Sequence, residues 1–135
     1  MSSTDPKADR QASKAARDAL GEPFDSEAEW HDSVKVIRLK GTLGSECSDR
    51  FRRDVCRDVS RTPTALILDL SGLTFIDSSG IRLLVETRAW ALEDQIDLAF
   101  VRGTGQVQRA LELAGIDREV RMGTDASELL GQAGR

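Results

Sequence analysis

The chain has 135 residues, of which 39% are hydrophobic and 31% are charged, and its formal net charge is −4. This length suffices for one domain with a buried core, and the composition is typical of a soluble globular protein. The acidic balance argues against direct binding of nucleic acid, which usually requires a basic excess or stripe. The sequence has no apolar run of the roughly 18–20 residues needed for a membrane span, and its N-terminus lacks a secretory signal pattern, so we expect a cytoplasmic protein.

Cysteine and histidine are scarce, which limits the chemistry available for metal binding and nucleophilic catalysis. The two cysteines, Cys47 and Cys56, have a spacing that suits neither a zinc knuckle nor a redox pair. His31 is the only histidine, so a histidine-based metal cluster is excluded and a Ser-His-Asp triad would have to use this residue. We therefore expect no metal, no cofactor and no catalytic residue.

The N-terminal segment, residues 1–22, is predicted to be a flexible tail, because charged residues of both signs alternate there with alanines and provide little apolar surface. A partner-binding or membrane-surface arm is the alternative interpretation. The folded domain is expected to span residues 23–131, which leaves residues 132–135 as a frayed C-terminus.

Apolar and polar residues alternate at residues 24–30 and again at residues 34–40, which predicts two strands joined as a hairpin. The glycines of residues 41–44 predict that the second strand ends there. Ser45 is then expected to cap a helix, because apolar residues recur at every fourth position along one face. These residues are Cys47, Phe51, Val55 and Val59.

Strands and helices alternate in the second half of the chain, with strands predicted at residues 65–70, 96–101 and 119–122. Residues 65–70 are almost entirely apolar, as expected for a strand that is covered on both faces. The resulting order is ββαβαβαβα. Because strand–helix–strand units favour parallel neighbours and the hairpin adds an antiparallel pair, this order predicts an α/β fold with a mixed sheet of four to five strands and about four helices.

The most informative segment is a corner formed by Asp77, Ser78, Ser79 and Gly80, which follows a buried strand and a short loop and opens a helix. An aspartate or serine at such a place caps a helix by accepting hydrogen bonds from backbone N–H groups that have no helical partner. One residue would suffice for capping, whereas here a carboxylate and two hydroxyls precede a glycine that permits close approach of another chain. Both a plain cap and a functional serine therefore stay open.

Catalytic and nucleotide-binding interpretations of the glycine- and serine-containing segments are much weaker. Neither Ser78 nor Ser79 lies in the Gly-x-Ser-x-Gly pattern of a hydrolase. The glycine-rich phosphate-binding pattern with its lysine is absent from the sequence, and Gly103-Thr104-Gly105 lacks the third glycine of a dinucleotide-binding loop.

The helix after the corner carries two apolar stripes. The stripe expected to face the core consists of Ile81, Leu84, Val85, Ala89 and Leu92. A second stripe consists of Leu83, Thr87 and Trp90, at positions i, i+4 and i+7. This second stripe is either buried as well or forms a contact surface beside the serine corner, where tryptophan is a frequent binding anchor.

Residues 68–80, with the sequence Leu-Asp-Leu-Ser-Gly-Leu-Thr-Phe-Ile-Asp-Ser-Ser-Gly, resemble the STAS domain of bacterial anti-sigma factor antagonists. Residues 107–116 are similar to the third helix of that family and its closing glycine, and the resemblance covers roughly residues 24–131. It implies a STAS-like fold and a protein that binds an anti-sigma factor, which is also a serine kinase, and thereby frees the sigma factor. It further implies that the kinase phosphorylates Ser78 and switches the antagonist off, that a serine phosphatase reverses this, and that the protein is a substrate and not an enzyme.

One position departs from the family pattern. The family often has Gly-Glu-Leu-Asp after its second strand, whereas this chain has Gly41-Thr42-Leu43-Gly44, so a glycine stands where an acid is expected. STAS domains also serve without phosphorylation, as scaffolds or as subunits of larger complexes such as lipid transporters, and this is the alternative function. The intact corner favours the phosphorylated antagonist, for which the predicted partner-binding residues are Asp77, Ser78, Ser79, Gly80, Leu83, Thr87 and Trp90.

Overall fold

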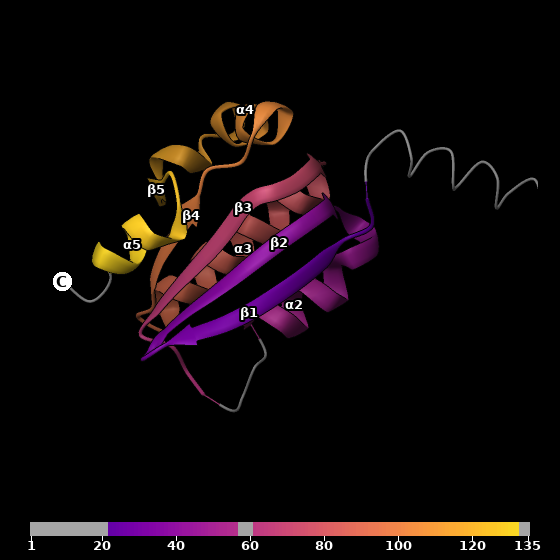
Figure 1. The fold of residues 1–135 in the computed structure, drawn as a ribbon. Coiled ribbons are helices and arrows are strands. Elements are labelled where there is room, and N and C mark those ends of the chain that lie inside the picture. The colour runs from indigo at the N-terminus through magenta and orange to yellow at the C-terminus, as the bar shows by residue number, and fades with distance from the viewer. Residues whose placement is uncertain (1–21, 57–60, 133–135) are drawn as a thin grey trace, which may run out of the picture.

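The computed structural model describes residues 22–56 and 61–132, and this part of the chain forms a mixed sheet with helices packed on both faces (Figure 1). The strands occur in the sheet in chain order, as β1 (Asp25–His31), β2 (Val34–Leu43), β3 (Ala65–Ile76), β4 (Asp97–Val101) and β5 (Arg121–Gly123). β1 pairs with β2 in the antiparallel sense, and the remaining neighbours are parallel.

The helices connect the parallel strands and close the chain. They are η1 (Ser45–Cys47), α2 (Ser48–Cys56), α3 (Ser78–Glu93), α4 (Gly105–Ala114), η2 (Ile116–Arg118) and α5 (Ala126–Gln132), where η denotes a 3-10 helix. The predicted order of elements and the mixed α/β sheet are therefore confirmed. Among the described residues, no helix is both long and apolar enough to cross a membrane. Val59 and residues 1–21 and 133–135, for which predictions were made, lie outside the described residues.

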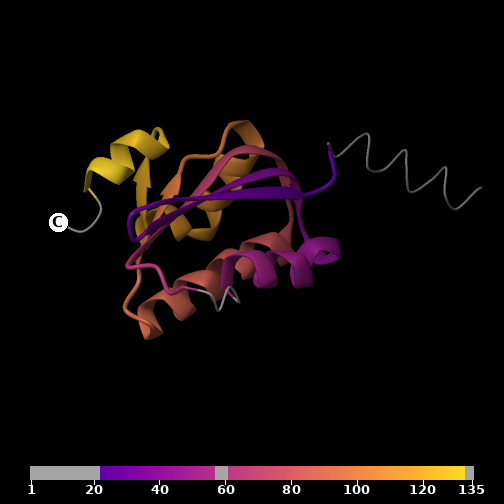
Figure 2. The same ribbon diagram turned by 60° about the horizontal axis from the view of Figure 1, so that its bottom comes forward.

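The sheet separates two apolar cores, because successive side chains of a strand point to opposite faces. The larger core lies between the sheet and α2, α3 and α4, and it includes Leu39, Phe51, Leu68, Leu84, Phe100 and Leu111. The smaller core lies on the opposite face under α5, and it consists of Val36, Ile67, Ala99, Val101 and Leu129. Figure 2 shows α2 and α3 along one face of the sheet and α5 on the other. The centre of β3 is thus covered on both faces, as its apolar sequence indicates.

β2 runs past the glycine at which it was predicted to end, and β3 runs past its predicted end at residue 70. β2 continues through Gly41 to Leu43, and β3 continues through Gly72 to Ile76, with two register shifts between the strands. Gly41 has a φ of +81°, and a Cβ atom there would lie 2.1 Å from the carbonyl oxygen of Pro23. Gly41 therefore permits both the register shift in β2 and the close approach of the backbone at Pro23.

Helix α3 buries a different side from the one predicted. Its buried residues include Leu83, Leu84, Thr87 and Ala91, whereas Ala89 is exposed and Val85 and Leu92 are 48% and 63% exposed. The hydroxyl of Thr87 donates to the carbonyl oxygen of Leu83 at 2.8 Å, so burial leaves this polar group with a partner. The prediction that Val85, Ala89 and Leu92 face the core is wrong, and the buried alternative for the second stripe holds at Leu83 and Thr87.

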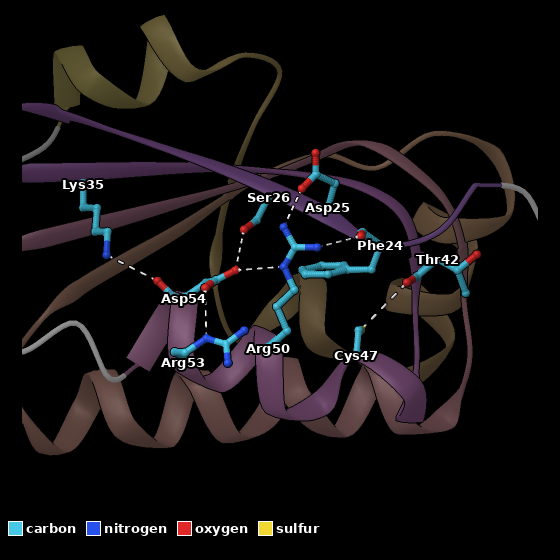
Figure 3. A network of polar contacts seen from close by, with 9 residues as sticks. All are labelled: Phe24, Asp25, Ser26, Lys35, Thr42, Cys47, Arg50, Arg53 and Asp54. Atoms are coloured by element: carbon cyan, nitrogen blue, oxygen red, sulfur yellow. Dashed lines mark hydrogen bonds and ion pairs between the residues drawn. The ribbon is translucent and has the colours of Figure 1, made fainter.

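A network of polar contacts fastens α2 to β1 (Figure 3). The Arg50 guanidinium donates to the Asp25 carboxylate at 2.5 Å and to the Phe24 carbonyl at 3.2 Å. The carboxylate of Asp54 accepts a hydrogen bond from the Ser26 hydroxyl at 2.7 Å. The hydrogen bond from Arg50 lowers the pKa of Asp25. This network therefore joins α2 to the start of β1.

Candidate functional site

The corner between β3 and α3 is a well-formed helix cap. Asp77 has extended backbone dihedrals, and its Oδ1 atom accepts a hydrogen bond from the Gly80 backbone N–H at 2.9 Å. The Asp77 carbonyl accepts from Ile81 at 3.0 Å, which begins the helical hydrogen bonds. The Asp77 N–H donates to the Leu43 carbonyl at 3.3 Å and so ties the cap to the end of β2. Asp77 therefore supplies the cap that the sequence predicts at this corner.

The two serines are not needed for capping. Ser78 is the first residue of α3 and is exposed, while Ser79 is half-buried. Within residues 22–56 and 61–132, neither hydroxyl forms a hydrogen bond. Because Asp77 alone accepts the bond from the first turn, the Ser78 hydroxyl is available to a partner or a modifying enzyme.

Two glycines allow β2 to approach this corner closely. A Cβ atom at Gly80 would lie 2.2 Å from the Leu43 carbonyl oxygen, so the closely approaching chain is the end of β2 in the same molecule. A Cβ atom at Gly44 would lie 2.7 Å from Asp77 Oδ2. The carboxylate of Asp77 thus occupies the space that a side chain at position 44 would need.

The segment after Gly44 is held by a cysteine. The Cys47 thiol donates to the Gly44 carbonyl at 3.2 Å, and burial raises the pKa of this thiol. A raised pKa keeps the thiol protonated at neutral pH, so it can continue to donate. Cys47 therefore helps to fix the backbone of Gly44 against the Asp77 carboxylate.

The predicted partner-binding residues divide into exposed and buried groups. Ser78 is exposed, and Asp77, Ser79 and Trp90 are half-buried. Three of the predicted residues are buried, namely Gly80, Leu83 and Thr87, and the latter two are 1% and 0% exposed. Leu83 and Thr87 therefore have almost no surface that a partner could contact in this conformation.

A different set of side chains lines α3 next to Ser78. We define the exposed face of α3 as Ser78, Arg82, Val85, Ala89 and Leu92, all of which are exposed. Their spacing of three and four residues places them on one side of the helix. The sequence pattern assigned all three apolar members of this set to the core, and Arg82 was not among the predicted site residues. The signal that could have found this face is the helical period counted from Ser78 itself.

The histidine lies far from this corner. His31 pairs with Val34 at one end of the β1–β2 hairpin, whereas Leu43 pairs with Ile76 just before the corner. At about 3.3 Å per residue along β2, these two ends are roughly 30 Å apart. His31 contacts Glu29 at 3.5 Å. The structure therefore does not bring the histidine and Ser78 together.

Comparisons with known proteins agree with the fold. The family model of the STAS domain matches residues 25–129. The chain is similar to the anti-sigma-F factor antagonist RsfB of Mycobacterium tuberculosis, with 25% identity over 92 residues, which is 68% of this chain and 75% of that protein.

Solved structures show the same fold. An anti-sigma factor antagonist from Mycobacterium paratuberculosis has a TM-score of 0.70 and 21% identity, covering 84% of this chain and 96% of the other. The Bacillus cell fate determinant SpoIIAA in its phosphorylated form has a TM-score of 0.63 and 18% identity, covering 82% of this chain and 98% of the other.

Proposed function

Because the chain belongs to the STAS domain family, we propose that it is an anti-sigma factor antagonist that binds an anti-sigma factor with serine kinase activity. In this proposal, phosphorylation of Ser78 by that partner switches the antagonist off, and a serine phosphatase restores it. The observation that best supports the proposal is the exposed Ser78 hydroxyl, which has no hydrogen bond among the described residues and stands beside a cap supplied by Asp77. The similarity to the antagonist RsfB supports the class of partner.

The start of α3 is a place where the fold can accept a phosphate. A phosphoserine adds about −1.5 to −2 charges and three acceptor oxygens. The N-terminus of a helix favours negative charge, and the first turn of α3 contains no acidic residue of its own. We therefore expect the fold to survive phosphorylation at Ser78, so that its main effect falls on binding.

The exposed face of α3 is the surface that we propose for docking. Val85 and Leu92 are 48% and 63% exposed, and they continue from Ser78 along the same side of the helix. A partner that covers these apolar side chains also covers Ser78 and would have to desolvate a phosphate placed there. A loss of about 3 kcal/mol reduces affinity by roughly two orders of magnitude. The protein would act in the cytoplasm as a binding partner and substrate, without catalysis of its own.

The test uses the full chain and its anti-sigma factor, obtained by co-purification from the source organism. With ATP, we expect tandem mass spectrometry to locate one phosphate on Ser78, and Ser78→Ala to abolish it. Ser79→Ala is the matched control and should still be modified. Calorimetry should show that phosphorylation weakens binding about 100-fold. An unmodified Ser78 in the presence of an active kinase would rule out the switch.

A second candidate function is an interaction module that works without phosphorylation, for example as a scaffold subunit of a larger complex. The observation in its favour is Gly44, which stands where the family often has an acid and which lies against the Asp77 carboxylate. A stable co-purifying partner whose affinity is unchanged by Ser78→Glu would favour this alternative over the switch.

A further inference from the structure

Arg82, on the exposed face of α3, has no partner within the described residues. It is exposed and makes no hydrogen bond or ion pair with any residue in 22–56 or 61–132. Other arginines of α2 and α3 do have carboxylate partners: Arg50 pairs with Asp25, Arg52 with Glu86 and Arg88 with Glu119. Among the described residues, the guanidinium of Arg82 thus differs from these three in contacting no carboxylate.

The neighbours of Arg82 along the helix indicate which group could pair with its guanidinium. Ser78 lies four residues before Arg82 and Glu86 lies four residues after it, so both are adjacent to Arg82 on the helix surface. However, both carboxylate oxygens of Glu86 accept hydrogen bonds from Arg52 of α2, at 3.1 and 3.3 Å. The carboxylate that could pair with Arg82 is thus held by another helix, and Ser78 is the neighbour that remains.

The direction of the pair also favours Ser78. An acidic group four residues before a basic one stabilises a helix better than the reverse order, because each charge then lies toward the favourable end of the helix dipole. A phosphate on Ser78 with Arg82 has this favourable order, whereas Arg82 with Glu86 has the reverse one. A guanidinium also offers two parallel N–H donors that match the oxygens of a phosphate.

We propose that Arg82 is a positioning residue that pairs with the phosphate of phosphorylated Ser78, an inference that rests on the proposed function. The pairing changes what a partner meets on α3 in two ways. Phosphorylation adds a dianion at Ser78 and, in the same step, engages the guanidinium of Arg82. A partner that places an acidic group against Arg82 in the unmodified protein therefore loses that contact as well as meeting the phosphate.

The test measures the phosphate directly and does not depend on a kinase. Phosphoserine is placed at position 78 of the full chain during translation with an expanded genetic code. Phosphorus NMR in about 0.1 M salt then gives the pKa for the second ionisation of the phosphate, which is ordinarily near 6. Because Arg82 favours the dianion, we expect Arg82→Gln to raise this pKa by about 0.3 pH units or more. Arg82→Lys should keep the pKa closer to the wild-type value.

Arg88→Gln is the matched control, since it removes a positive charge from the same helix. It lies ten residues after Ser78, at about 15 Å along the helix axis, which exceeds the Debye length of roughly 10 Å at this salt concentration. We expect it to change the phosphate pKa by less than about 0.1 unit.

A pKa that is the same in the wild type and in Arg82→Gln, or equal shifts in Arg82→Gln and Arg88→Gln, would overturn the assignment. Either result would leave the proposed function standing if the kinase still modifies Ser78. Conversely, a shift confined to Arg82→Gln in a protein that no kinase modifies would support the pairing and reject the proposed switch.

Discussion

The contact between Gly44 and the Asp77 carboxylate leads to a quantitative prediction about Gly44→Ala. The backbone of Gly44 has φ −160° and ψ −165°, which is extended and accessible to alanine. The obstacle is the new Cβ atom, which would lie 2.7 Å from Asp77 Oδ2 and 3.1 Å from its Cγ atom. The substitution therefore tests a side-chain contact and not a backbone conformation.

The expected change in the free energy of unfolding follows from the strain that Gly44→Ala places on the Asp77 helix cap. To restore an ordinary contact of about 3.4 Å, the Asp77 carboxylate must move by roughly 0.7 Å, which strains its 2.9 Å hydrogen bond to Gly80. Loss of a cap costs about 1 kcal/mol. Replacing glycine by alanine returns about 0.5 kcal/mol by reducing the entropy of the unfolded chain. Gly44→Ala alone should thus be destabilising by about 0.5 kcal/mol.

Gly44→Ala should change the free energy of unfolding in the opposite direction when Asp77 is already replaced by alanine. Asp77→Ala loses the cap but removes the obstructing carboxylate, so adding Gly44→Ala should then be stabilising by about 0.5 kcal/mol. The double-mutant cycle therefore predicts an interaction energy of about 1 kcal/mol between the two positions. Urea unfolding of the four proteins, followed by tryptophan fluorescence, gives this quantity. Equal effects of Gly44→Ala in both backgrounds would refute the contact.

Three further predictions concern α3 and the contact between α2 and β1. Leu83→Ala should lower the free energy of unfolding by about 2–5 kcal/mol in urea titrations, because it creates a cavity in the larger core; a change below 1 kcal/mol would contradict its burial. Leu92→Ser should leave stability within about 0.5 kcal/mol but weaken anti-sigma factor binding at least tenfold by calorimetry, and unchanged affinity would exclude the exposed face of α3 as the interface. The hydrogen bond from Arg50 lowers the folded pKa of Asp25 below its ordinary value of 3.8, so this pair should stabilise the fold above about pH 4 and lose that effect as pH falls through the lowered pKa. Arg50→Gln should raise the Asp25 pKa in an NMR titration, and an unmoved pKa would show that the pair does not form in solution.

Local patterns predicted those features that depend on residues close together in the chain. The β1–β2 hairpin follows from alternating apolar residues, and the cap at Asp77 follows from the residue types that satisfy a helix start. Gly115 ends α4 with a φ of +79°, as its position after the apolar face predicts.

The ends of β2 and β3 depend on contacts across the sheet, which the sequence does not show. Gly41 was predicted to end β2, because glycine is common in turns and destabilises regular strands. In the structure, β3 continues alongside it and supplies hydrogen-bond partners, and the register shifts absorb the irregularity. The contact between Gly44 and Asp77 likewise joins two strand ends that are distant in the chain, so no local pattern could predict it.

The buried side of α3 was ambiguous because apolar residues occur around most of the helix. The stripe containing Val85 and Leu92 was assigned to the core, and the second stripe was left open as either buried or a contact surface. Burial of Thr87 does not leave its hydroxyl without a hydrogen bond, because the Leu83 carbonyl of the same helix accepts one from it. Val85 and Leu92 remain exposed, as single apolar residues on a protein surface often are, and periodicity alone does not tell which of two apolar stripes faces the solvent.

The most direct test of the proposed switch is a binding measurement on the full chain before and after phosphorylation. The anti-sigma factor, titrated into unmodified protein and into protein carrying one phosphate on Ser78, should bind the unmodified form about 100-fold more tightly. Treatment of the phosphorylated form with a serine phosphatase should restore the original affinity. Equal affinities for the two forms, with the phosphate on Ser78 verified by mass spectrometry, would contradict the account.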